Sequence, residues 1–141
     1  MISEVNSLCS DKQSLGTSAV TGTSSTNVLD FVAQEPVYDG TLHFLVIIGP
    51  GVAGGTSVQA KIQTSANNSD WVDIADTGTV ALANIPADGV LLDKVVDEDF
   101  RGKRYWRVAY TTVGSFTANK GPVMTAGLFT ESAPHYKKSF A

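Results

Sequence analysis

Ser57–Ser65 reads SVQAKIQTS, a stretch in which two kinds of side chain alternate without a break. One set of positions holds Val58, Ala60, Ile62 and Thr64, and the other holds glutamine, lysine and serine. Successive side chains of a β-strand point to opposite faces, so a strand would place the first set on the buried face of a sheet. A helix would gather only Val58 and Ile62 on one stripe. The stretch therefore predicts a strand.

The same alternation recurs in Lys103–Thr112. It places Trp106, Val108 and Tyr110 on one face, and the valine between the two aromatic residues indicates that this face is core. Shorter runs of the same kind predict further strands at Asn27–Ala33, Thr41–Ile48, Trp71–Ala75, Thr79–Leu82, Val90–Val96 and Val123–Thr130. No helical pattern of ten residues separates them. Eight short strands at this spacing predict an all-β fold, an eight-stranded β-sandwich of the jelly-roll type.

Composition agrees with this fold class. The chain of 141 residues is long enough for one domain with its own core, and its commonest residues are valine, threonine, serine and glycine. β-Branched residues lose rotamer freedom in helices and suit a pleated sheet. The composition thus disfavours a helical bundle or coiled coil, and the 43% of apolar residues disfavours a fully disordered chain.

The ends of the chain differ from this body. Residues 10–26 hold nine serines or threonines in seventeen positions, which predicts an extended arm or a long loop rather than a packed element. We therefore expect an extended N-terminal arm over residues 1–26. The sandwich is expected over residues 27–130, and residues 131–141 form a short C-terminal tail with few apolar residues. Within the body, Thr41–Ile48 is apolar at nearly every position, which predicts a central strand covered on both faces.

Several classes of function are disfavoured by what the sequence lacks. No apolar run approaches the roughly 20 residues that span a bilayer, and no secretory signal is present, so no membrane association is expected. Cys9 is the single cysteine, which excludes an internal disulfide and indicates a protein made in a reducing cytoplasm. The net charge of −4 disfavours nucleic-acid binding, which requires lysines and arginines to neutralise phosphates.

Charge is nevertheless uneven along the chain. The first hundred residues carry thirteen acidic and three basic side chains, whereas residues 101–141 carry seven basic and one acidic side chain. The basic block from Arg101 to Arg107 could face an acidic protein partner. It could equally neutralise the acidic run Asp97–Asp99 just before it, and this second interpretation is favoured.

Motifs for catalysis or cofactor binding are weak. Gly49–Gly54 fits the pattern G-x-G-x-x-G, but a strand rather than a helix is expected to follow it, and Pro50 has no amide to donate. His43 lies in an apolar strand, where a hydrogen-bonded core imidazole is expected, and no nucleophile elbow accompanies it. A solvated turn is favoured over a weak calcium site for Asp97–Asp99. We therefore expect no enzyme activity, no cofactor and no metal.

Several sequence blocks resemble a known family. These are Leu15–Phe31 (LGTSAVTGTSSTNVLDF), residues 61–71 (KIQTSANNSDW), residues 104–117 (RYWRVAYTTVGSFT) and the last strand with its ending Leu128-Phe129. Together they are similar to the small jelly-roll capsid cement proteins, also called decoration proteins, of tailed bacteriophages, over roughly residues 8–130. The resemblance implies a structural virion protein on the outer capsid surface. It also implies as partners a major capsid protein of the HK97-like fold and further copies of the chain, in a homo-dimer or a homo-trimer.

We expect the arm and the tail to carry contacts to capsid protein or to sister subunits, and the sandwich to fold without residues 1–20. The candidate contact residues are Leu15, Val20, Arg101, Arg104, His135, Tyr136, Lys137 and Lys138. The alternative is a carbohydrate-binding or adhesin-type β-sandwich module, in which Trp71 and Tyr105 would form an exposed aromatic platform.

Overall fold

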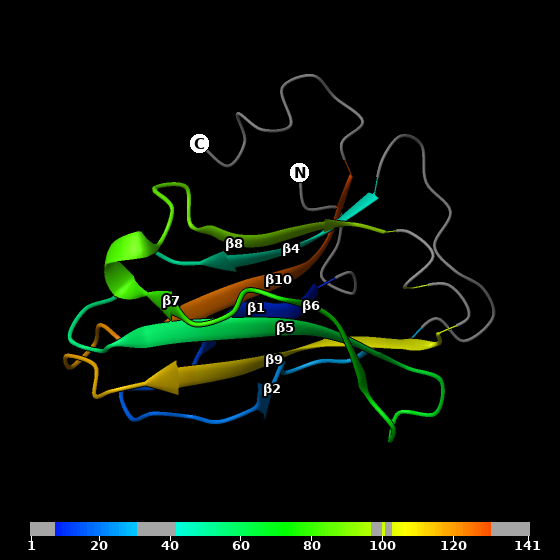
Figure 1. The fold of residues 1–141 in the computed structure, drawn as a ribbon, viewed down its shortest axis with the longest axis horizontal. Helices are drawn as coiled ribbons and strands as arrows, with labels where there is room; N and C mark the ends of the chain where they lie inside the picture. The colour runs from blue at the N-terminus through cyan, green and yellow to red at the C-terminus, as the bar shows by residue number, and fades with distance from the viewer. Residues whose placement is uncertain (1–7, 31–41, 97–99, 101–102, 131–141) are drawn as a thin grey trace.

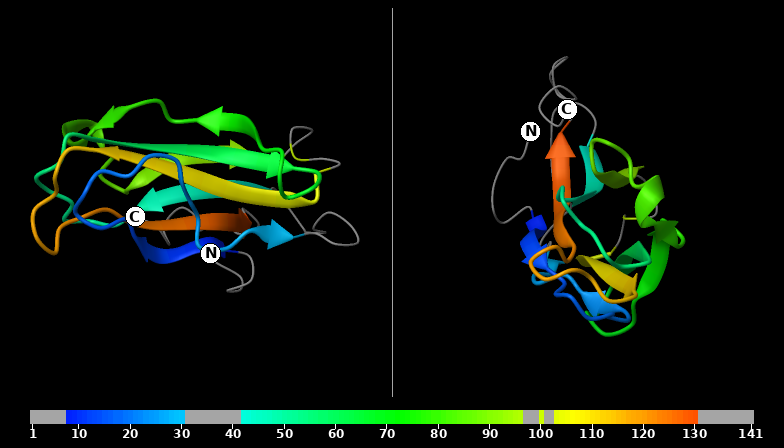
Figure 2. Two further views of the ribbon diagram at one scale, coloured as in Figure 1. Left: turned by 90° about the horizontal axis from the view of Figure 1, so that it is seen from below. Right: turned by 90° about the vertical axis from the view of Figure 1, so that its left-hand side faces the viewer.

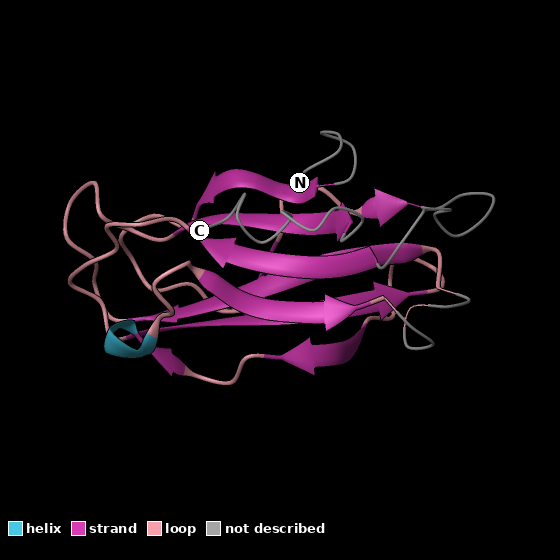
Figure 3. Ribbon diagram, turned by 90° about the horizontal axis from the view of Figure 1, so that it is seen from above, coloured by secondary structure: helices cyan, strands magenta, loops and turns pink. Residues whose placement is uncertain are grey.

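The computed structural model describes residues 8–30, 42–96, 100 and 103–130, which form two antiparallel sheets packed face to face (Figure 1). One sheet has four strands in the order β1-β10-β4-β8. Their bounds are Leu8–Ser14 for β1, Val123–Thr130 for β10, Leu42–Ile48 for β4 and Val90–Val95 for β8. This layer is uppermost in Figure 1, and Figure 3 views the molecule from that side.

The second sheet has six strands and is built on the long strands β5 (Ser57–Ser65) and β9 (Tyr105–Val113). The short strands β2 (Thr23–Ser24) and β3 (Leu29–Asp30) pair with successive parts of β9, and β6 (Val72–Asp76) and β7 (Val80–Ala81) pair with successive parts of β5. Each short pair therefore acts as one interrupted strand.

Counted in this way, the described residues form eight strands in two sheets of four, the arrangement of a jelly roll. The only helical segment in the described ranges is the 3-10 turn η2 (Leu82–Asn84). No helix in those ranges has the length and hydropathy needed to cross a membrane. The predicted fold class is confirmed, and Figure 2 shows the two layers from below and from one end.

The core lies between the sheets, on the faces that the alternation predicts. Trp106, Val108 and Tyr110 of β9 are fully buried, as are Ala60 and Ile62 of β5. The indole nitrogen of Trp106 donates a hydrogen bond of 2.8 Å to the carbonyl of Lys103, so the buried ring leaves no donor unsatisfied. The ring of Phe100 lies 4.6 Å from that of Trp106, measured between centroids.

The expectation of an N-terminal arm over residues 1–26 is wrong from Leu8 onward. β1 is an edge strand that pairs with β10, and Leu8, Cys9 and Ser10 are all buried. The hydroxyl of Tyr110 lies 2.8 Å from that of Ser10, which links β1 to the opposite sheet. The polar composition of residues 10–14 does not prevent strand formation, because an edge strand tolerates polar side chains and its backbone bonds to β10. Residues 1–7 lie outside the described residues.

Strand boundaries also differ from the prediction in two places. Within the described part of Asn27–Ala33, only Leu29–Asp30 is strand. Residues 31–33 lie outside the described residues. The two strands expected at Trp71–Ala75 and Thr79–Leu82 are β6 and β7, the two pieces of one interrupted strand along β5. The predicted tail, residues 131–141, lies outside the described residues.

Candidate interaction surfaces

Three of the eight candidate contact residues, Leu15, Val20 and Arg104, lie within the described ranges. Leu15 is buried in the core, and Val20 packs against it while its backbone bonds to Thr112 of β9. Both residues therefore take part in the packing of the sandwich, and the contact role expected of them stays a prediction. Arg104 is described, and its surroundings follow below. Five candidates lie outside the described residues: Arg101, His135, Tyr136, Lys137 and Lys138.

Arg104 forms a two-pronged ion pair with Asp30 at the edge of the six-stranded sheet. Its Nε and Nη2 donate to the two carboxylate oxygens of Asp30 at 2.6 and 3.1 Å. This pairing lowers the pKa of Asp30 and raises that of Arg104, because hydrogen bonding favours both charged forms. The guanidinium also lies 4.9 Å above the ring of Tyr105. The pair joins β3 to the start of β9, so Arg104 neutralises a carboxylate that is distant in sequence.

A row of hydrogen-bonded polar side chains crosses the outer face of the six-stranded sheet. We call it the polar ladder: Gln59, Lys61 and Gln63 of β5, Asp73 and Asp76 of β6, and Arg107 of β9. Arg107 donates to Gln63 at 2.8 Å, and Gln63 donates to Asp73 at 2.7 Å. The ammonium of Lys61 lies 3.5 Å from the same carboxylate.

The other end of the polar ladder is fixed in the same way. Gln59 donates to the carboxylate of Asp76 at 2.8 Å, and the backbone amide of Gly78 donates to the same oxygen at 2.7 Å. These two bonds lower the pKa of Asp76, with that from Gln59 the larger cause. Because each side chain is held by a neighbour on the next strand, the polar ladder is preorganised rather than a set of freely rotating side chains.

Trp71 lies beside the polar ladder and contacts it through Arg107. The Arg107 guanidinium carbon is 4.0 Å from the centroid of the indole ring, a cation–π contact between the start of β6 and the middle of β9. Partial burial lowers the pKa of Arg107. Trp71 and Tyr105 each have an arginine over one ring face, so those faces are used within the molecule. This arrangement does not favour a sugar platform, for which the ring face must be open.

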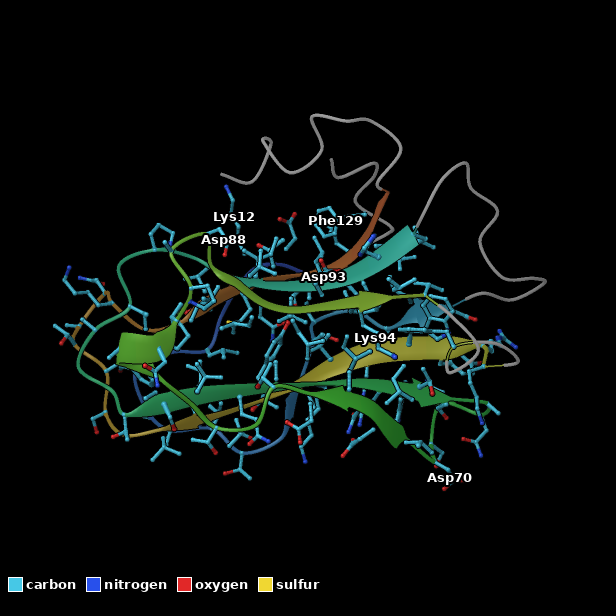
Figure 4. The ribbon with its side chains drawn as sticks, turned by 45° about the horizontal axis from the view of Figure 1, so that its top comes forward. Lys12, Asp70, Asp88, Asp93, Lys94 and Phe129 are labelled. Atoms are coloured by element: carbon cyan, nitrogen blue, oxygen red, sulfur yellow. The ribbon has the colours of Figure 1, made fainter. Side chains whose placement is uncertain are left out.

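The outer face of the four-stranded sheet has a different character. It carries an apolar group that we call the outer patch: Leu8 of β1, Leu45 and Ile47 of β4, Val90 of β8, and Phe129 of β10. His43 pairs in register with Phe129, and its ring bonds to Asp93 of β8. His43 is buried and hydrogen-bonded as expected, but on this outer face rather than between the sheets. In Figure 4, Phe129 and Asp93 are labelled on this upper side.

The glycine-rich loop after β4 is part of the end of the sandwich. As predicted, a strand (β5) follows Gly49–Gly54. The amides of Gly49 and Ala53 donate to carbonyls of Val123 and Lys120, at 2.8 and 3.1 Å. These amides are therefore bound within the molecule and do not converge on a phosphate.

Groups that could support catalysis or metal binding are dispersed. Burial raises the pKa of Cys9 to about 12, which holds the thiol in its unreactive form. Within the described ranges, no three residues among histidine, cysteine, aspartate and glutamate lie close enough together to hold a metal ion. The acidic run Asp97–Asp99 lies outside those ranges.

Comparison with known families adds a finding that geometry cannot give. Residues 9–130 match the Bbp16 family, a Bordetella phage protein family. The chain belongs to the Bbp16 family. No curated protein matches the sequence.

The Bbp16 match coincides with the jelly-roll body. It begins at Cys9, within β1, and ends at Thr130, the last residue of β10. The family sequence pattern therefore includes the N-terminal strand, in agreement with its place in the sheet. The resemblance to phage proteins is confirmed at this level, as is the β-sandwich fold.

Sequence reasoning identified the faces of the Bbp16 jelly roll but not the polar ladder that crosses one of them. Alternation in β5 assigns Gln59, Lys61 and Gln63 to one face, and alternation in β9 assigns Arg107 to one face. Only the register, in which Gln63 pairs with both Arg107 and Asp73, brings these side chains together. No local sequence pattern predicts that register.

Proposed function

We propose that this phage protein is a structural virion protein, a capsid cement protein that binds the outer surface of the major capsid protein shell and stabilises the head. We propose further that it has no enzyme activity and that its partners are a capsid protein of the HK97-like fold and other copies of the chain. Membership of a phage family and the jelly-roll fold support the proposal. Fold alone does not define function, so the surface must carry the argument.

The observation that carries the proposal is the preorganised face formed by the polar ladder and Trp71. Tryptophan and arginine are enriched among residues that dominate binding energy at protein interfaces. On this face they are already stacked, at 4.0 Å, and Arg107 is also bonded to Gln63. Side chains that are fixed before binding lose less conformational entropy on association. A rigid sheet face with ordered polar groups suits repeated docking on a regular shell.

The test is reconstitution of phage heads that lack this protein. Purified protein is added to such heads, and bound copies are counted by quantitative gel or mass spectrometry. We expect saturable binding in hundreds of copies per head and increased resistance of the heads to heat.

Substitutions on the face of the polar ladder test whether this face binds the head. Arg107→Ala and Trp71→Ala should each weaken head binding by roughly 10-fold to 100-fold, the effect of losing about 1.4–2.8 kcal/mol at an interface residue. Lys120→Ala, which removes a positive charge from the exposed β9–β10 connection, is the matched control and should bind as the wild type does. Absence of binding by the wild type would reject the cement function, and full binding by both variants would reject this face.

A further inference from the structure

The two lateral sides of the sandwich, where the edges of its sheets approach each other, are closed in different ways. On one side, β1 is hydrogen-bonded to the segment that holds β2 and β3. The amide of Asn27 donates to the carbonyl of Cys9 at 2.9 Å, and the side-chain amide of Gln13 donates to the carbonyl of Ser24 at 3.2 Å. Apolar residues on this side are buried, with Cys9 0% and Leu29 4% exposed. Hydrogen bonds therefore seal this side.

The opposite side is formed by β6, β7, η2 and β8 and is built differently. It faces the viewer in Figure 1, and the end view of Figure 2 places it across the molecule from β1 and β2. Among the described residues, no strand pairing joins β8 to β6 or β7. Apolar side chains close the gap instead, packed against the core but still partly exposed. We call these six residues the open side: Ile74, Val80, Leu82, Ile85, Leu91 and Leu92.

β8 borders the open side and is an edge strand of the described sheet, because it pairs there with β4 alone. An edge strand presents backbone amides and carbonyls to which an added strand can bond. Leu91 and Leu92 of β8 belong to the open side, and Val95 is 46% exposed. The facing pieces β6 and β7 have only five and two residues. The longer edge of β8 is therefore the better site for an extended segment.

The register of β8 specifies the side chains that such a segment would carry. Leu92 pairs with Val46, which lies in the core, so it points toward the space between the sheets. Asp93 pairs with Leu45, which lies on the outer face of the four-stranded sheet. Successive side chains of an added strand would alternate in the same way. One set would cover the open side, and the other would lie beside Asp93.

Charge determines the chemistry of the second set. The carboxylates in or next to β6 and β8, three of them labelled in Figure 4, are Asp70, Asp73, Asp76, Asp88 and Asp93. The neighbouring cations are Lys94 of β8 and Lys61, which lies 3.5 Å from Asp73. Five negative and two positive charges give this rim a net charge of −3. Asp93 is bonded to His43, yet 41% of its side chain stays exposed. The rim repels the same rim of a second copy and attracts a basic segment.

We propose that β8 and the open side bind an extended segment of a partner protein in which apolar and basic residues alternate. The segment pairs with the outer edge of β8, its apolar side chains cover the open side, and its lysines or arginines lie beside Asp93. This surface is distinct from the polar ladder. The inference goes beyond the proposed function and does not depend on it.

The experiment is titration of the full chain with synthetic peptides, followed by NMR of the backbone amides. The probe is the acetylated and amidated peptide KVKVKVT, and EVEVEVT has the same apolar residues with the opposite charge. We expect saturable binding of the lysine peptide, with shifted amide signals and slower amide exchange in β8. The glutamate peptide should bind at least about tenfold more weakly, because its carboxylates face the acidic rim.

Charge variants test the role of Asp93. Asp93→Lys should weaken binding of the lysine peptide by about tenfold, because it turns an attraction into a repulsion. Asp93→Asn keeps a hydrogen-bonding side chain beside His43 and should weaken binding in the same direction, by about threefold. Asp11→Lys changes the charge equally on the exposed part of β1, across the molecule, and should leave the affinity within about twofold.

Each alternative outcome has a definite meaning. Absence of saturable binding by the lysine peptide would overturn the proposal, and equal affinity of the two peptides would overturn its basic partner. Shifts confined to β1 or to the polar ladder would place the segment elsewhere. Shifts in β8 that follow protein concentration without peptide would assign the edge to a second copy and also overturn the proposal. Because no phage heads are used, these results are separate from the test of head binding.

Discussion

At the scale of single residues, Cys9 shows how burial decides chemistry. Its thiol is fully buried between β1 and the core and lies 3.5 Å from the carbonyl oxygen of Ala126. Desolvation is the largest cause of its raised pKa, because the thiolate would lose its hydration without gaining a cation.

We therefore predict that Cys9 resists thiol reagents in the folded protein. A pKa of about 12 instead of 9.0 lowers the thiolate fraction at pH 8 by about a thousandfold, and steric exclusion lowers the rate further. The measurement is the rate of reaction with a chromogenic disulfide, with and without denaturant. Rapid modification of the native protein would show that β1 opens readily from the sheet.

Also at the residue scale, Gly121 is required by a close approach of two loops. A Cβ at this position would overlap the carbonyl oxygen of Gly16, a backbone atom that cannot move aside cheaply. Gly121→Ala should therefore destabilise the protein by about 1–3 kcal/mol, as overpacking does.

Gly49→Ala is the control for this prediction. A Cβ at Gly49 would be 3.5 Å from the nearest atom, an ordinary contact, so the change should be neutral or stabilise by about 0.4–1 kcal/mol. Urea unfolding of both variants measures the two effects. Equal stability of the two variants would mean that the loops separate without cost.

At the scale of elements, the sequence predicts the long regular strands and misses the irregular one. β5 and β10 match their predicted bounds, and in β5 two kinds of side chain alternate along the whole length. β1 was missed because Leu8, Cys9 and Ser10 are buried in succession, and two register shifts against β10 break the period of two. The division of one strand into β6 and β7 has a similar cause, since the interruption depends on pairing with β5. In both cases the strand boundaries depend on pairing with a strand that is distant in sequence, so the local pattern of side chains cannot predict them.

The place of β1 gives the third prediction, which replaces the expectation that the sandwich folds without residues 1–20. Deleting residues 1–7 should leave a folded protein. Deleting residues 1–20 removes β1 and the buried Leu15, leaves β10 as an open edge, and should unfold or aggregate the chain. Each buried leucine lost costs about 2–5 kcal/mol, against a typical total stability of about 5–15 kcal/mol. Circular dichroism and gel filtration of both deletions measure this. A cooperative melt near the wild-type temperature for the longer deletion would contradict the role of β1.

At the scale of the whole molecule, the two outer faces of the jelly roll differ in chemical character. The six-stranded sheet presents the polar ladder, whose side chains are already hydrogen-bonded to one another or paired in charge. The four-stranded sheet presents the outer patch, so that β4 is buried along nearly its whole length on both faces. The continuous apolar sequence of Thr41–Ile48 predicts this double burial.

The last prediction concerns the unity of the core. One cluster of buried residues joins both sheets, with members from β1, β4, β5, β9 and β10, so neither sheet keeps its apolar face covered when the other opens. We therefore expect a single cooperative unfolding transition in urea, with a slope of about 1–3 kcal/mol per molar. The variant Trp71→Phe leaves Trp106 as the sole tryptophan, a probe that is fully buried between the sheets. Its fluorescence and the far-ultraviolet circular dichroism should change at the same urea concentration. If fluorescence changes first, the sheets separate before their strands unpair, and the sandwich does not behave as one cooperative unit.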